Sequence, residues 1–196
     1  MQRYSAADDS IDPATGLLRN KAGLTGQAEL DTFEAAVTTV RILEWDDAPG
    51  ASSFDLAHLC AAHRHLFQDV YDWAGQIRNV DITRGNSRFA NVNQIDSYAT
   101  KLFAGLKSED FLGGLPAGRL AGRLAHYLSE INALHPFRDG NGRVQRVFIS
   151  QLASAAGFSW DYSAATREEM YTAMEAAFFG NEELLARLIA QNLTAH

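Results

Sequence analysis

Two apolar helical segments meet at the stretch His135-Pro136-Phe137-Arg138-Asp139-Gly140-Asn141-Gly142-Arg143-Val144-Gln145-Arg146. Pro136 disfavours helical dihedral angles at His135, so the helix that arrives there is expected to stop. Gly140 and Gly142 permit backbone angles that are closed to other residues, and an apolar helical pattern restarts near Asn141. The stretch therefore predicts a tight loop between two helices.

The same stretch carries the groups needed to hold and transfer a phosphate. Unpaired amides at a helix start form an anion site, and Arg143 and Arg146, three residues apart, share one face of that helix. Asp139 can supply a carboxylate to Mg²⁺, which needs few protein ligands when phosphate oxygens complete its shell. His135 can accept a proton from the hydroxyl of a second substrate. Because two arginines would hold the tail of a triphosphate, we expect attack at the α-phosphate with loss of pyrophosphate.

This segment resembles the signature of the Fic family, H-x-F-x-[D/E]-G-N-G-R-x-x-R, and matches all eight specified positions. The resemblance covers roughly residues 55–180. It implies a protein adenylyltransferase, which moves AMP from ATP to a Ser, Thr or Tyr hydroxyl of a target protein. It also implies the site residues: His135 as the base, Asp139 as the Mg²⁺ ligand, Gly140, Asn141 and Gly142 as the anion hole, Arg143 and Arg146 as contacts to the β- and γ-phosphates, and Phe137 among the residues that bind the nucleotide.

A second feature lies upstream, at residues 77–95. Ile77–Ile82 has the pattern of a short strand, and turn-forming residues follow it before a helix that starts near Gln94. An isolated hairpin presents an open edge that can hold an extended peptide by main-chain hydrogen bonds. The alternative is a covered structural ribbon. The segment resembles the flap on which Fic proteins dock their targets, which implies docking by Thr83, Arg84, Gly85, Asn86, Ser87, Arg88, Phe89 and Ala90.

Helical periodicity dominates the remaining chain. The predicted helices are Ala28–Trp45, Asp55–Val70, Gln94–Leu106, Ala117–Leu134, Asn141–Ala156, Thr166–Phe178 and Glu182–Asn192. The fold class is therefore all-α, as a mainly helical Fic fold with one small β-hairpin flap near the active site. We expect residues 1–54 to form an N-terminal extension and helix that pack on a core of residues 55–196, with the catalytic loop at 135–146.

Composition limits the class of protein. A hydrophobic content of 46% and a charged content of 21% suit a globular domain with a proper core. A net charge of −7 argues against general nucleic-acid binding, which depends on clustered Lys and Arg. The single cysteine, Cys60, falls on an apolar helical stripe and is interpreted as packing. We expect no membrane span, and a cytoplasmic protein, with the translocated effectors of the family as a second possibility.

The N-terminal piece from Ile11 to Lys21 has turn signals and resembles the start of Fic toxins that are paired with a small antitoxin, and of related secreted bacterial effectors. An ordinary helical segment that wraps around the core is equally compatible with these residues. Family members often carry an inhibitory helix, [S/T]-x-x-x-E-[G/N], whose glutamate pairs with the second arginine of the motif. Thr25 to Glu29 matches the first half, but Leu30 follows where Gly or Asn is required. We therefore expect a separate antitoxin that supplies the inhibitory glutamate in trans.

Two other functions are compatible with these residues. A binding module could hold a nucleotide or phosphopeptide in the same anion hole without chemistry. A transferase could use another donor such as UTP or GTP, since nothing in the motif reads the base. Taken singly, His135 could be a helix-end residue and 139–142 a type I′ turn, although a hairpin has no strands to join there.

Overall fold

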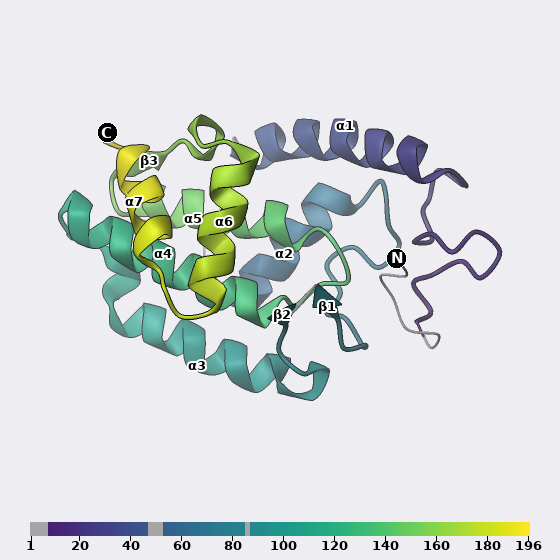
Figure 1. Cartoon of the computed structure of the whole chain (residues 1–196), viewed down its shortest axis with the longest axis horizontal. Coiled ribbons are helices and arrows are strands. Elements are labelled where there is room, and N and C mark those ends of the chain that lie inside the picture. Colours follow the sequence, from purple (N-terminus) through teal and green to yellow (C-terminus); the bar gives the residue numbers. More distant parts are fainter. Residues whose placement is uncertain (1–7, 47–52, 85–86) are drawn as a thin grey trace.

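The computed structural model describes residues 8–46, 53–84 and 87–196, and it confirms a mainly helical fold (Figure 1). Within these ranges the α-helices are α1 Gln27–Asp46, α2 Leu56–Phe67, α3 Ile95–Ser108, α4 Ala117–Leu134, α5 Asn141–Ala155, α6 Arg167–Phe178 and α7 Glu183–Gln191. Short 3-10 turns occupy Val92–Gln94, Asp110–Leu112 and Tyr162–Ala164.

The helices begin and end close to the predicted positions because local capping groups set their ends. The Asp55 side chain accepts from the His58 amide before α2. Thr166 and Glu169 form a capping box at the start of α6. The carbonyl of Pro116 accepts the first bonds of α4, and His135 ends that helix in the left-handed conformation. All seven predicted helices are thus confirmed, with ends shifted by at most a few residues.

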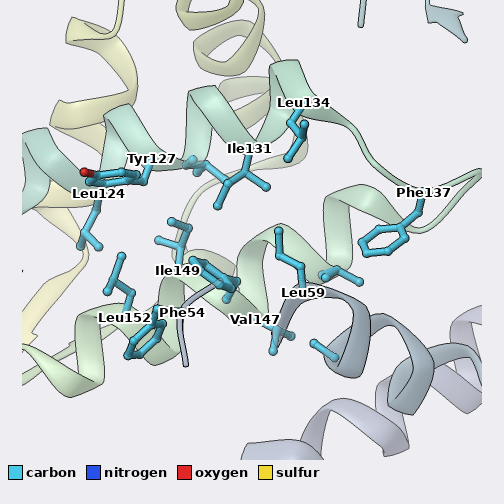
Figure 2. Close-up of a cluster of buried hydrophobic side chains, with 14 of the residues drawn as sticks. Phe54, Leu59, Leu124, Tyr127, Ile131, Leu134, Phe137, Val147, Ile149 and Leu152 are labelled. Carbon is cyan, nitrogen blue, oxygen red and sulfur yellow. The ribbon is translucent and has the colours of Figure 1, made fainter. Parts of the chain in front are cut away.

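The core lies between α4, α5 and α2, at the centre of the molecule. Leu124, Leu128 and Ile131 of α4 are almost fully buried, as are Val147 and Leu152 of α5. Figure 2 shows these two helices facing each other across their apolar side chains, with α2 closing the space below. The loop at residues 135–140 joins α4 to α5, so both of its ends are attached to this core.

The hairpin is shorter than predicted, and the prediction of a strand at Ile77–Ile82 was wrong. The paired strands are β1 Thr83–Arg84 and β2 Ser87–Arg88, antiparallel, with Thr83 opposite Arg88. Residues 77–82 are not strand because their hydrogen-bonding groups are used elsewhere: the Arg78 amide, for example, donates to the Pro136 carbonyl. A second antiparallel pair, β3 Phe158–Trp160 with β4 Leu193–Ala195, ties the C-terminal segment to the end of α5 and was not predicted.

Leu18 and Leu30 of the N-terminal segment are buried in this core. Ile11 and Leu18 form an isolated bridge around the turn that the sequence indicated, and α1 runs along one side of the molecule above α2 (Figure 1). Cys60 is half-buried on α2, and burial raises the pKa of its thiol to about 11, which agrees with a packing role. No helix in the described ranges combines the length and apolar character needed to cross a membrane.

Candidate active site

His135 is held in one orientation and one tautomer. Its backbone is left-handed, with φ 44° and ψ 61°, and its Nδ1 lies 3.0 Å from the carbonyl oxygen of Asn132. Since a carbonyl can only accept, Nδ1 carries the proton and the lone pair is on Nε2. The Phe89 ring stacks on the imidazole at a centroid distance of 3.7 Å and an angle of 16°. The arrangement gives the ring an accepting Nε2, as a general base requires.

The loop after His135 is closed by Asn141. Its side-chain oxygen accepts from the Phe137 amide at 2.9 Å, and its side-chain nitrogen donates to the Phe137 carbonyl at 2.8 Å. Asn141 is buried, so its side chain holds the loop together. Gly140 has φ 78°, and a Cβ there would lie 2.4 Å from Cζ of Phe67. Both the positive φ and the close ring explain why only glycine fits at this position.

His63 supports the loop from beneath and was not singled out by the sequence. The Gly75 amide donates to its Nδ1 at 2.8 Å, so Nε2 carries the proton and donates to the Asp139 carbonyl at 3.1 Å. The imidazole is fully buried and stacked on Phe137, with ring centroids 4.1 Å apart. Burial lowers the pKa of His63 to about 4. Phe137 thereby packs into the core, and its ring, which the family resemblance placed among the nucleotide-binding residues, is not part of the cavity wall.

Backbone amides at the start of α5 remain available to an anion. Arg143 and Val144 donate to the Gly140 carbonyl, and the Gly140 amide donates to the Asp139 side chain at 2.6 Å. In the described part of the chain, the amides of Asn141 and Gly142 have no backbone acceptor. Of the three residues predicted to form an anion hole, Gly140 thus has its amide engaged by its own neighbour.

Arg143 is held by a carboxylate that sequence reasoning missed. Its guanidinium forms an ion pair with Glu34 of α1 and donates to the Thr38 hydroxyl at 2.9 Å. Tyr71 also donates to Glu34, and the Arg143 guanidinium lies over the Phe67 ring, 4.8 Å from its centroid. Glu34 and Thr38 are four residues apart and so share one face of α1. The pair fixes the guanidinium beside the loop.

Arg146 has a different environment. Its guanidinium lies 5.2 Å from the centroid of the Tyr162 ring, and burial lowers its pKa. Its Nε has no hydrogen-bond partner within the described ranges, where no carboxylate lies within ion-pair distance of the guanidinium. A half-buried cation without a carboxylate favours an anion from outside the chain. Of the two motif arginines, Arg146 is thus the one that has no carboxylate partner among the described residues.

One cavity of about 770 Å³, a size typical of small-molecule sites, lies beside the loop. Its wall includes His135, Asp139, the 140–143 segment and Arg146. Asp139 fits a divalent cation, because it adds a hard carboxylate donor to this wall beside the anion-binding amides. The far wall, which the sequence did not predict, comes largely from α6, through Met170, Tyr171, Met174, Glu175 and Phe178.

The flap forms one side of the cavity. Thr83 and Phe89 line it, Phe89 is buried, Arg88 is exposed and Ala90 is half-buried at the base of the hairpin. Arg84 and Ser87 pair within the hairpin, and the predicted docking residues Gly85 and Asn86 lie outside the described residues. The structure therefore brings the hairpin and the loop together, as the sequence predicted, through Phe89 above all.

Comparisons with known proteins agree with this geometry. A model of the Fic/DOC family matches residues 53–153. The protein adenylyltransferase VbhT of Bartonella schoenbuchensis is 43% identical over 99% of this chain, which spans only 41% of VbhT. The probable protein adenylyltransferase y4lH of Sinorhizobium fredii is 40% identical over 95% of this chain and 96% of its own length. The crystal structure of the BepC effector protein of Bartonella tribocorum, with bound AMPPNP, is similar with a TM-score of 0.89 at 27% identity, covering 95% of this chain and 97% of that one.

Proposed function

Because this chain belongs to the Fic/DOC family, we propose that it is a protein adenylyltransferase that moves AMP from ATP to a Ser, Thr or Tyr hydroxyl of a target protein. One observation carries this proposal: the accepting imidazole of His135 and the anion site of the loop line the same cavity. The BepC structure holds AMPPNP, and the similar Fic domain from Bartonella quintana holds ADP, which supports a nucleotide in this position.

In the proposed reaction, the target hydroxyl oxygen attacks the α-phosphorus of ATP. A new oxygen–phosphorus bond forms, the bond to the bridging oxygen of pyrophosphate breaks, and the hydroxyl proton passes to Nε2 of His135. The amides of Asn141 and Gly142, together with Arg146 and Arg143, would hold the phosphates. The chain's own contribution is thus to orient the reactants and to balance charge on the leaving pyrophosphate.

Asp139 would hold Mg²⁺, which supplies a positive charge that neutralises the phosphate oxygens. Its carboxylate accepts from the Gly140 amide, which orients it at the cavity wall. We therefore assign Asp139 the role of metal ligand, as the family resemblance implies.

We further propose that the target docks on the flap. The hairpin stands alone beside the cavity, and main-chain pairing along an open strand edge would place a target hydroxyl near His135 without selecting the target's sequence. Target choice would then depend on surfaces beyond the hairpin.

Control of the enzyme is proposed to come from a separate antitoxin. The chain lacks the [S/T]-x-x-x-E-[G/N] pattern, and Glu34 of α1 pairs with Arg143. Arg146 therefore remains available to a glutamate from a partner, which would compete with the terminal phosphate. A free enzyme of this kind would act as a toxin in the cytoplasm where it is made, or in a cell into which it is translocated.

The test incubates the purified chain and a bacterial lysate with Mg²⁺ and each of α-labelled ATP, GTP and UTP. We expect protein labelling with ATP, and none with His135→Ala, although this variant should still bind ATP. Labelling with GTP or UTP but not with ATP would show that the donor is that other nucleotide. Nucleotide binding with no transfer from any donor would favour the binding-module alternative and refute the enzyme proposal.

A further inference from the structure

Arg78 is buried at the point where the flap meets the catalytic loop. Its side chain has no exposed surface, and the polar groups around it are mainly carbonyls. Nε donates to the His135 carbonyl at 2.9 Å, Nη1 donates to the Val80 carbonyl at 2.8 Å, and Nη2 donates to the Ala90 carbonyl. One guanidinium therefore binds the histidine, the segment that enters the flap and the segment that leaves it.

Backbone contacts strengthen the same junction. The Arg78 amide donates to the Pro136 carbonyl at 2.9 Å, and the Ala90 amide donates to the Ala133 carbonyl at 2.9 Å. Asp81 lies 3.7 Å from the guanidinium and accepts from the Val92 amide at 2.8 Å, so it joins the two ends of the hairpin as well. The flap is thus attached to the loop at its base.

The contact on His135 has a specific consequence. The residue is left-handed, a conformation that non-glycine residues adopt only when their surroundings impose it. Its carbonyl faces Arg78, and its ring stacks on Phe89, which directly precedes Ala90 in the chain. The His135 backbone, through Arg78, and the His135 ring, through Phe89, are therefore both connected to the segment that leaves the flap at residues 89–90.

We infer that Arg78 is a positioning residue that keeps the catalytic histidine and both ends of the flap in one fixed arrangement. The inference rests on the proposed function, in which the flap presents the target hydroxyl and His135 takes its proton. Only arginine has a planar fork able to reach three carbonyls in different directions, and a lysine would keep the charge but not this geometry. Nucleotide binding depends on the start of α5 and should be independent of Arg78.

The experiment compares wild type, Arg78→Lys and the matched control Arg123→Lys. Arg123 is also bound by side-chain hydrogen bonds, to Glu109 at 2.7 and 2.6 Å, but it lies near the other end of α4. Label transfer from α-labelled ATP to lysate proteins is measured over a range of ATP concentrations. For Arg78→Lys we expect the maximal rate to fall at least ~10-fold while the KM for ATP stays within about 2-fold, since misplacement of reacting groups costs rate rather than nucleotide affinity. Arg123→Lys should match wild type in both values.

Hydrogen exchange supplies a readout that does not depend on catalysis. In Arg78→Lys, amide exchange should rise together in residues 87–92 and 133–137 and stay unchanged in residues 141–155. An unchanged maximal rate, exchange that rises in only one of the two segments, or a loss of ATP affinity equal to the loss of rate would each overturn the inference. A wild-type chain that transfers no label would instead refute the proposed function, and the exchange pattern would still decide whether Arg78 joins flap and loop.

Discussion

Acidification should destabilise this protein through His63, beneath the catalytic loop. Burial lowers the pKa of its imidazole from 6.5 to about 4. In the unfolded chain the ring takes up a proton below its ordinary pKa, whereas in the folded chain it stays neutral down to about pH 4. The stability contributed by this group is therefore complete above about pH 6.5 and is lost as the pH falls towards 4. Between pH 7 and pH 5 the loss works out at about 2 kcal/mol, at about 1.4 kcal/mol per pKa unit.

The assay is urea unfolding of wild type and His63→Gln at pH 7, 6 and 5. The variant loses the bonds to the Gly75 amide and the Asp139 carbonyl, so it should be less stable than wild type at pH 7. Because it has no ring to protonate, its free energy of unfolding should fall about 2 kcal/mol less than that of wild type over this range. The gap between the two proteins should therefore narrow as the pH is lowered.

Phe67→Leu is the matched control. Phe67 stacks on His63 with ring centroids 4.7 Å apart, so this substitution loosens the same cluster and leaves the imidazole in place. Its pH dependence should run nearly parallel to that of wild type. If His63→Gln also runs parallel to wild type, the folded protein does not hold His63 neutral, and the description of the loop's support is wrong.

Three further results are expected from the packing and charges around the site. Gly140→Ala should lower the free energy of unfolding by at least about 2 kcal/mol, because alanine would have to adopt a strained positive φ and its Cβ would overlap the Phe67 ring. The same substitution should cost less in a Phe67→Ala background, where that overlap is absent. Glu34→Ala should lower the free energy of unfolding by about 1–3 kcal/mol, because Arg143 and Tyr71 lose their shared acceptor. Glu29→Ala, at an exposed residue of the same helix, should change it by less than about 0.5 kcal/mol. Equal effects of the two substitutions would contradict the assigned ion pair. With its pKa raised to about 11, the Cys60 thiol should react with iodoacetamide at pH 8 far more slowly in the native protein than in urea, and equal rates would show that it is not protected.

The helices could be predicted from the sequence because their signals are local. The helix Ala117–Leu134 has its periodic apolar face between Pro116 and Pro136, and its observed bounds are the predicted ones. The loop after it was predicted for the same reason: proline and glycine restrict or free the backbone at their own positions. Elements defined by spacing within one segment need no knowledge of the rest of the chain.

The strand predicted at Ile77–Ile82 failed because strand pairing is not a local property. Alternating apolar residues suit an extended backbone, and the segment is not helical. Its hydrogen-bond partner, however, is the catalytic loop, which the pattern could not indicate. The pair of β3 and β4 was missed for a related reason, since its strands have only three residues each and lie at opposite ends of the C-terminal region.

The contacts that hold the active-site residues in place also come from distant parts of the sequence. Glu34 lies 109 residues before Arg143, and His63 lies 76 before Asp139. Neither residue belongs to a recognisable motif. Glu34 is followed by Ala35, where the inhibitory pattern requires Gly or Asn, and a buried histidine on an apolar stripe has no distinguishing spacing. The motif contains the groups that would react, but the positions of those groups depend on acceptors and donors from α1, α2 and the flap base. A protein could therefore keep all eight motif residues and still lose the site if one of these distant contacts were removed.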